Sequence, residues 1–115
     1  MPEMVAAGLE RNFAARQAAR PGNRRGLTDE TFAARLAMVA ELYERDARWW
    51  GVFIRWCRTD EGYRARGGPG AASQLFYRAA LGARDDAERD ARDMRELEQS
   101  ARRRTAEAAG TAVAA

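Results

Sequence analysis

The fold is decided by residues 28–58, which read TDETFAARLAMVAELYERDARWWGVFIRWCR. On a helix that turns about 100° per residue, one line of apolar side chains comprises Phe32, Leu36, Val39, Tyr43, Ala47, Trp50, Ile54 and Cys57. A second row of large side chains runs beside it and comprises Met38, Leu42, Trp49, Phe53 and Trp56. A surface helix usually has a narrower apolar stripe and a broad polar back. We therefore expect this helix to contact two neighbours, one of which belongs to another protein chain.

A few residues predict where this helix begins and whether it is continuous. Thr28 is a favourable N-cap residue, and Asp29 and Glu30 complement the positive end of the helix dipole. Gly51 lies inside the segment, where glycine costs about 1 kcal/mol relative to alanine. Because the apolar line keeps its phase on both sides of Gly51, we expect one continuous helix that ends near residues 58–60.

A second long helix is predicted after a turn near residues 60–71. The run Gly67-Gly68-Pro69-Gly70 disfavours helix, and Gly110 is a natural helix stop, so this helix should span about residues 72–109. Its expected inner line is Phe76, Ala79, Ala83, Ala87, Ala91, Met94, Leu97 and Ala101. Small residues that let two helices approach closely should face this line from the first helix, namely Ala33, Ala37, Ala40, Ala47 and Gly51. Two long helices joined by such a turn form an antiparallel hairpin.

The N-terminal residues predict a short amphipathic helix. Val5, Leu9 and Phe13 share one face of this helix, and the sequence Arg20-Pro21-Gly22-Asn23 ends it. The helix is too short to cover the whole second row of the main helix.

The expected fold is therefore all-α, with an antiparallel two-helix hairpin of long helices and a short N-terminal helix, completed by self-association. We divide the chain into a basic N-terminal arm (residues 1–26), a hairpin body (27–110) and a frayed tail (111–115).

Composition favours the same fold class and indicates where the protein works. The chain has 115 residues and is rich in Ala, Arg, Glu and Leu, as coiled coils and long helices are. All 20 basic residues are Arg, which we attribute to a GC-rich bacterial genome. The single Cys57 excludes an internal disulfide, and no segment approaches the roughly twenty apolar residues of a membrane span. The N-terminus also lacks the pattern of a signal peptide, so we expect a cytoplasmic protein.

The second row of the main helix is the strongest candidate for a functional surface. Trp, Phe and Met are enriched where proteins meet, and Trp is a frequent hot-spot residue. We therefore expect a protein interface, for a homodimer or a helical partner, that comprises Met38, Leu42, Trp49, Phe53 and Trp56. The alternative is that these side chains form core beneath the N-terminal helix.

Catalysis is not expected. The chain has no His, which excludes Cys–His and Ser–His pairs. Cys57 lies on the apolar line, where a buried thiol is usually inert packing. No cluster of residues predicts a cofactor, a metal ion or a small-molecule substrate, so we expect a non-enzymatic interaction or oligomerisation module.

The placement of charge leaves a second functional class open. The formal net charge is +3, and residues 1–26 carry the whole excess, with five Arg against two Glu. The candidate phosphate contacts are Arg11, Arg16, Arg20, Arg24 and Arg25. If they bind nucleic acid, the affinity should fall steeply with salt. The alternative function is thus a small nucleic-acid-associated protein, and the sequence names neither the partner nor the biological process.

Overall fold

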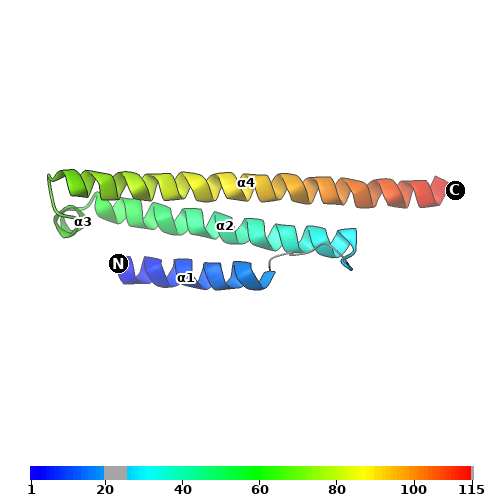
Figure 1. Ribbon diagram of the computed structural model, residues 1–115, viewed down its shortest axis with the longest axis horizontal. Helices are drawn as coiled ribbons and strands as arrows, with labels where there is room; N and C mark the ends of the chain where they lie inside the picture. Colours follow the sequence, from blue (N-terminus) through cyan, green and yellow to red (C-terminus); the bar gives the residue numbers. More distant parts are fainter. Residues whose placement is uncertain (20–25, 115) are drawn as a thin grey trace.

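The structure, a computed structural model, describes residues 1–19 and 26–114 of the chain. Within these ranges the chain forms the helices α1 (Pro2–Ala19), α2 (Asp29–Cys57), α3 (Asp60–Ala65) and α4 (Ala71–Ala114), and no β-strand. Helices α2 and α4 pack along each other, so the expected all-α hairpin is confirmed. The Cα atoms span 69 × 20 × 18 Å, and the molecule is therefore a rod (Figure 1).

Helix α2 begins where the sequence predicts. The Thr28 hydroxyl oxygen accepts a hydrogen bond from the Thr31 amide at 3.0 Å, and Thr28 has the extended backbone of an N-cap residue. The helix passes through Gly51 without a break and ends at Cys57, which confirms the prediction of one continuous helix. A Cβ atom at Gly51 would meet only the end of the Arg55 side chain, at 3.8 Å, so no close contact requires glycine there.

The connection between α2 and α4 contains a short helix that the sequence did not predict. Helix α3 is capped by Thr59, whose hydroxyl oxygen accepts a hydrogen bond from the Gly62 amide at 3.1 Å. The chain then reverses at Gly67 and Gly68, which have φ angles of 104° and 65°. Glycine reaches positive φ without steric cost. Residues 67–70 are non-helical, as predicted.

Helix α4 is longer than predicted. It continues through Gly110 to Ala114, so the expected stop at Gly110 is wrong. Glycine inside a helix costs about 1 kcal/mol relative to alanine, but it does not force an end. The flanking alanines are the strongest helix formers, and they carry the helix through this position.

Small residues form the contact between α2 and α4, as expected. On α2, Ala33 and Ala40 are completely buried. The buried residues of α4 are Ser73, Ala80, Ala87, Ala91 and Ala101. The predicted inner line is correct at Ala87, Ala91 and Ala101, which are buried. It is wrong at Phe76, Ala79 and Leu97, which are exposed. The buried side chains of α4 are small. Tyr77, Leu81 and Met94 pack half-buried beside them, whereas Phe76 and Leu97 remain exposed.

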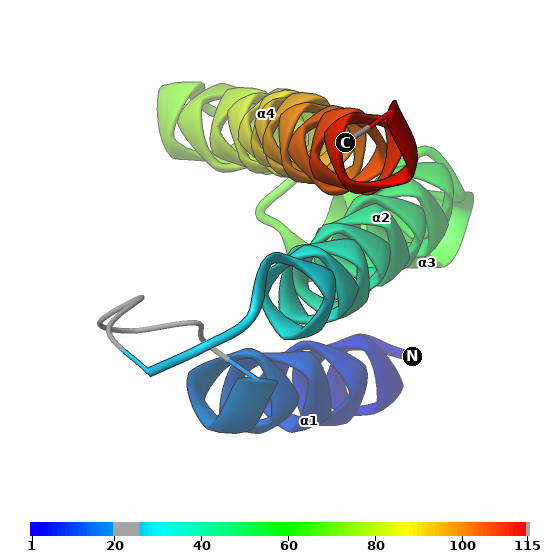
Figure 2. The same cartoon turned by 90° about the vertical axis from the view of Figure 1, so that its right-hand side faces the viewer.

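Helix α1 lies on the other side of α2 from α4 (Figures 1 and 2). Val5 of α1 joins a buried cluster with Phe53, Ile54 and Cys57 of α2 and Ala80 of α4. Residues 2–19 are therefore part of the helical body. At the opposite end of α2, the helix α4 projects past the start of α2 (Figure 1).

Candidate protein-interaction groove

An apolar groove runs between α1 and α4 and has α2 as its floor. Its central cavity has a volume of about 240 Å³. The residues that line it are Pro2, Val5, Ala6 and Leu9 of α1, Trp50 and Phe53 of α2, and Phe76, Ala79 and Ala80 of α4. All of these side chains are apolar. We call this feature, with its two extensions, the α1–α4 groove.

The groove extends in both directions from its centre. Towards α3 it opens into a space of about 430 Å³ that shares Pro2, Phe53 and Phe76 and adds Trp56. Towards the end of α1 it continues into a space of about 370 Å³ that shares Leu9 and Trp50. This last part also contains Phe13, Glu10, Arg16 and Asp46. From Pro2 to Arg16 the groove follows α1 for on the order of 20 Å.

Aromatic rings in the groove contact one another across the two long helices. The Phe53 ring lies edge-on to Phe76 of α4, with centroids 5.6 Å apart, and edge-on to Trp50, at 6.0 Å. Trp56 is the third neighbour of Phe53, at 5.7 Å. Phe53 is buried, whereas Phe76 is 51% exposed and Phe13 is 56% exposed. The cluster is therefore anchored in the core and open to solvent along the groove.

A buried polar cluster holds α1 against α2. Asp46 of α2 is buried, and its carboxylate accepts a hydrogen bond from the Asn12 side-chain amide at 2.9 Å. The Arg16 guanidinium forms an ion pair with the same carboxylate. It also lies over the Tyr43 ring, 4.6 Å from the centroid. Because one arginine and one amide pair with the charge of Asp46, its burial does not leave an unpaired carboxylate.

Close packing adds to this attachment. A Cβ atom at Gly8 of α1 would overlap the Trp49 indole, with the Cζ2 atom only 2.6 Å away. The absence of a side chain at Gly8 thus lets α1 lie directly on Trp49.

The predicted interface residues do not form one free surface. Leu42 and Phe53 are buried within the chain, and Trp49 is covered by Gly8 of α1. Met38 is exposed. Only Phe53 and Trp56 line the groove. The N-terminal helix covers more of this row than expected, because its glycine allows a close approach.

Trp50, Phe76 and Phe13 line the groove, but they do not belong to the surface row predicted from the sequence. The sequence places Trp50 on the apolar line of the first long helix and Phe76 on the inner line of the second, and both lines were expected to lie inside the hairpin. A signal was present in the composition of the Phe76 line, in which alanines separate Phe76 from Met94 and Leu97.

The arginines of the predicted nucleic-acid arm are placed differently from one another. Arg11 is exposed on α1. Arg16 is mostly buried and paired with Asp46, so its charge is used within the fold. Arg20, Arg24 and Arg25 lie outside the described residues.

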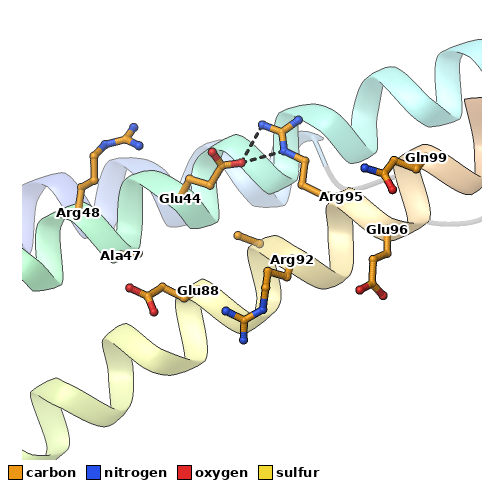
Figure 3. Close-up of a pocket in the computed structure, with 9 residues that line it drawn as sticks. Glu44, Ala47, Arg48, Glu88, Arg92, Arg95, Glu96 and Gln99 are labelled. Carbon is orange, nitrogen blue, oxygen red and sulfur yellow. Dashed lines mark hydrogen bonds and ion pairs between the residues drawn. The ribbon is translucent and has the colours of Figure 1, made fainter.

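A second hollow between α2 and α4 has a volume of about 650 Å³ (Figure 3). It is lined mainly by charged residues, which are Glu44, Arg48, Glu88, Arg92, Arg95 and Glu96. Arg95 bridges the two helices, with Nη2 2.7 Å from Glu44 Oε1 and Nη1 3.0 Å from Glu98 Oε1. Burial alone would raise the pKa of Glu98, but the hydrogen bonds from Arg95 and Arg102 together with the charges of both arginines outweigh it and lower the pKa. Acidic and basic groups alternate here, so the hollow favours no sign of ligand charge.

The groups with potential for chemistry are sparse in the described part of the chain. Cys57 is completely buried, and burial raises the pKa of its thiol, an effect that Arg66 partly opposes. Among the described residues, no three His, Cys, Asp or Glu side chains are placed to hold a metal ion. In the same ranges, no helix is both long and apolar enough to cross a membrane.

In comparisons with known proteins, no family model matches the chain, and no curated protein or solved structure matches it significantly.

Proposed function

We propose that this protein is a non-enzymatic helical interaction module that self-associates through the α1–α4 groove. The observation that carries the proposal is the open aromatic cluster of Trp50, Phe53 and Phe76, which lines a groove without charged residues at its centre. Apolar clefts and large aromatic side chains are typical of protein contact surfaces. This surface replaces the row predicted from the sequence, with which it shares Phe53 and Trp56.

The free energy available from the groove supports association. An aromatic side chain buries about 150–250 Å² when fully covered. Phe76 is 51% exposed, so covering it removes on the order of 100 Å² from water, worth roughly 2–3 kcal/mol. Phe13 offers a similar area. A symmetric dimer contains each contribution twice, which offsets part of the entropy lost on association.

Two neighbouring positions on α4 provide a matched test. Phe76 lines the groove, whereas Leu75 is 69% exposed and does not line it. We expect Phe76→Glu to weaken self-association by roughly 30-fold or more, the equivalent of about 2 kcal/mol. Leu75→Glu should leave it nearly unchanged. Sedimentation equilibrium over a range of concentrations measures both, and circular dichroism checks that each variant remains helical.

Two results would overturn the proposal. The first is an unmodified protein that stays monomeric at several hundred micromolar. The second is an equal effect of Phe76→Glu and Leu75→Glu, which would show that added charge rather than the groove controls association.

A further inference from the structure

The α1–α4 groove has one charged side chain at the end that opens towards α3. The space of about 430 Å³ at this end is lined by Arg66 and otherwise by apolar residues, which are Pro2, Phe53, Trp56, Ala65, Ala72 and Phe76. Ligand sites in proteins are typically apolar pockets of about 300–1,000 Å³ in which a few polar groups fix the orientation of the ligand. This end of the groove has that composition, with Arg66 as its polar group.

The guanidinium of Arg66 is held in place by neighbours that leave its charge unpaired. Its Nη1 atom donates a hydrogen bond to the Ser73 backbone oxygen at 3.0 Å. Its Cζ atom lies 5.3 Å from the centroid of the Tyr63 ring and 5.0 Å from that of the Tyr77 ring. Within the described part of the chain, its contacts include no ion pair with an acidic side chain, and its buried Nε atom has no hydrogen-bond partner. A half-buried guanidinium of this kind is complementary to a carboxylate, which pairs with arginine through strong, charge-assisted hydrogen bonds.

The apolar lining continues from Arg66 along the length of the groove. The space at Arg66 and the central cavity share Pro2, Phe53 and Phe76, so the two are continuous. Every residue that lines the central cavity as far as Leu9 is apolar. The distance from Pro2 to Leu9 along α1 is about 10 Å. The shape and chemistry of the groove therefore match a ligand with one anionic end and an extended apolar body.

The opposite end of the groove does not attract a carboxylate in the same way. Arg16 lines this end, but its guanidinium is already paired with Asp46. Glu10 also lines it, and its negative charge repels an anion. The charges at the two ends thus favour one orientation, in which the anionic group lies at Arg66 and the apolar body points towards Leu9.

We infer that the α1–α4 groove binds a long-chain carboxylic acid, with the carboxylate on Arg66 and the alkyl chain along Phe53 and Phe76. An alkyl chain has no polar group to desolvate in the apolar centre of the groove. An extended peptide would place backbone amides there without hydrogen-bond partners, which is costly. The inference goes beyond the proposed self-association and does not require it.

Isothermal titration calorimetry with decanoate at neutral pH, below the concentration at which it forms micelles, tests the inference in the full-length chain. Decanol has an alkyl chain of the same length without the negative charge. We expect the unmodified protein to bind decanoate at least about tenfold more tightly than decanol, because a hydrogen bond to a charged group contributes at least this factor. This comparison needs no variant, so it does not depend on how a substitution affects folding.

Two arginines that are close in the sequence provide matched variants. Arg66→Met should weaken the binding of decanoate at least about tenfold and leave that of decanol nearly unchanged. Arg64→Met removes the same charge from an exposed position of α3 that does not line the groove, and it should leave both affinities nearly unchanged. Arg66→Lys keeps the charge but loses the planar guanidinium, so its affinity for decanoate should be intermediate. Circular dichroism checks that each variant remains helical.

The outcomes separate this inference from the proposed self-association. A preference for decanoate over decanol that Arg64→Met retains and Arg66→Met removes supports the inference. It is overturned if decanoate does not bind, if decanol binds as tightly, or if the two methionine variants have equal effects. None of these results bears on self-association, which sedimentation of the ligand-free protein and the comparison of Phe76→Glu with Leu75→Glu test separately.

Discussion

The glycines inside the helices provide a test, because the structure and helix propensity predict opposite changes in stability at one of them, Gly8. Gly8, Gly51 and Gly82 lie within α1, α2 and α4. Replacing glycine by alanine inside a helix should stabilise it by about 0.5–1 kcal/mol. At Gly82 an added Cβ atom has no neighbour within 4 Å, and at Gly51 it meets one atom at 3.8 Å. We therefore expect Gly51→Ala and Gly82→Ala to raise the free energy of unfolding by this amount.

Gly8→Ala should instead destabilise the protein. The new Cβ atom would lie 2.6 Å from Trp49 Cζ2, well inside van der Waals contact, so the indole must rotate or α1 must move away from α2. Overpacking of this kind costs about 1–3 kcal/mol. After the gain in helix propensity, the net loss is roughly 0.5–2 kcal/mol.

Urea unfolding followed by circular dichroism, at one fixed protein concentration, measures all three variants. The double-mutant cycle with Trp49→Ala isolates the contact, since without the indole Gly8→Ala should become stabilising like the other two. If Gly8→Ala raises stability in the unmodified background as much as Gly51→Ala does, the close packing of α1 on Trp49 is refuted.

Two further predictions concern charged groups. Asp46→Ala removes the acceptor that pairs with Arg16 inside the α1–α2 contact, and should lower the free energy of unfolding by about 2–4 kcal/mol. The substitution Arg45→Ala, at an exposed position, should change the free energy of unfolding by less than about 0.5 kcal/mol. Equal effects of the two substitutions in urea unfolding would show that the Asp46 pair is not structurally important. Because the pKa of Glu98 is lowered in the folded state, its contribution to stability is complete above its usual pKa and is lost as the pH falls through the folded value. Glu98→Gln should therefore flatten the loss of stability on acidification, and an unchanged slope in a series of unfolding curves at acidic pH would contradict this.

The features that the sequence predicted well depend on local chemistry. The N-cap at Thr28 needs only one hydroxyl group and the first turn of its own helix. The continuity of α2 through Gly51 follows from the helical period of its apolar residues, which is the same before and after Gly51. The reversal at Gly67 and Gly68 needs positive φ, which glycine supplies wherever the rest of the chain lies.

The rotation of α4 about its axis was not predictable in the same way. Alanine occurs on nearly every side of this helix, so hydrophobic periodicity constrains its phase only weakly. Ala87, Ala91 and Ala101 of the predicted line are buried, but Ala80 is buried where Phe76 was expected, and Leu97 is exposed. This partial offset of the buried face from the large side chains leaves Phe76 and Leu97 exposed.

The polar cluster under α1 shows a signal that sequence reasoning did not use. Asp46 lies seven residues after Val39 and seven before Phe53, and all three are buried. On α1, Asn12 has the same spacing from Val5 and Ala19, which are also buried. A polar residue at heptad spacing between apolar ones lies on the buried stripe. Its partner was not predictable, because the sequence does not show which two stripes meet.

The buried stripes of α1 and α4 explain why the groove stays open within one chain. The stripe of α1 is narrow, and its members Val5, Asn12 and Ala19 are all buried. Leu9 and Phe13 lie at the edge of this stripe and turn towards the groove. On α4 the buried alanines are used against α2, which leaves the flank of Phe76 and Leu97. Because α1 and α4 lie on opposite sides of α2 (Figure 2), neither flank covers the other, and Phe13 and Phe76 both remain exposed.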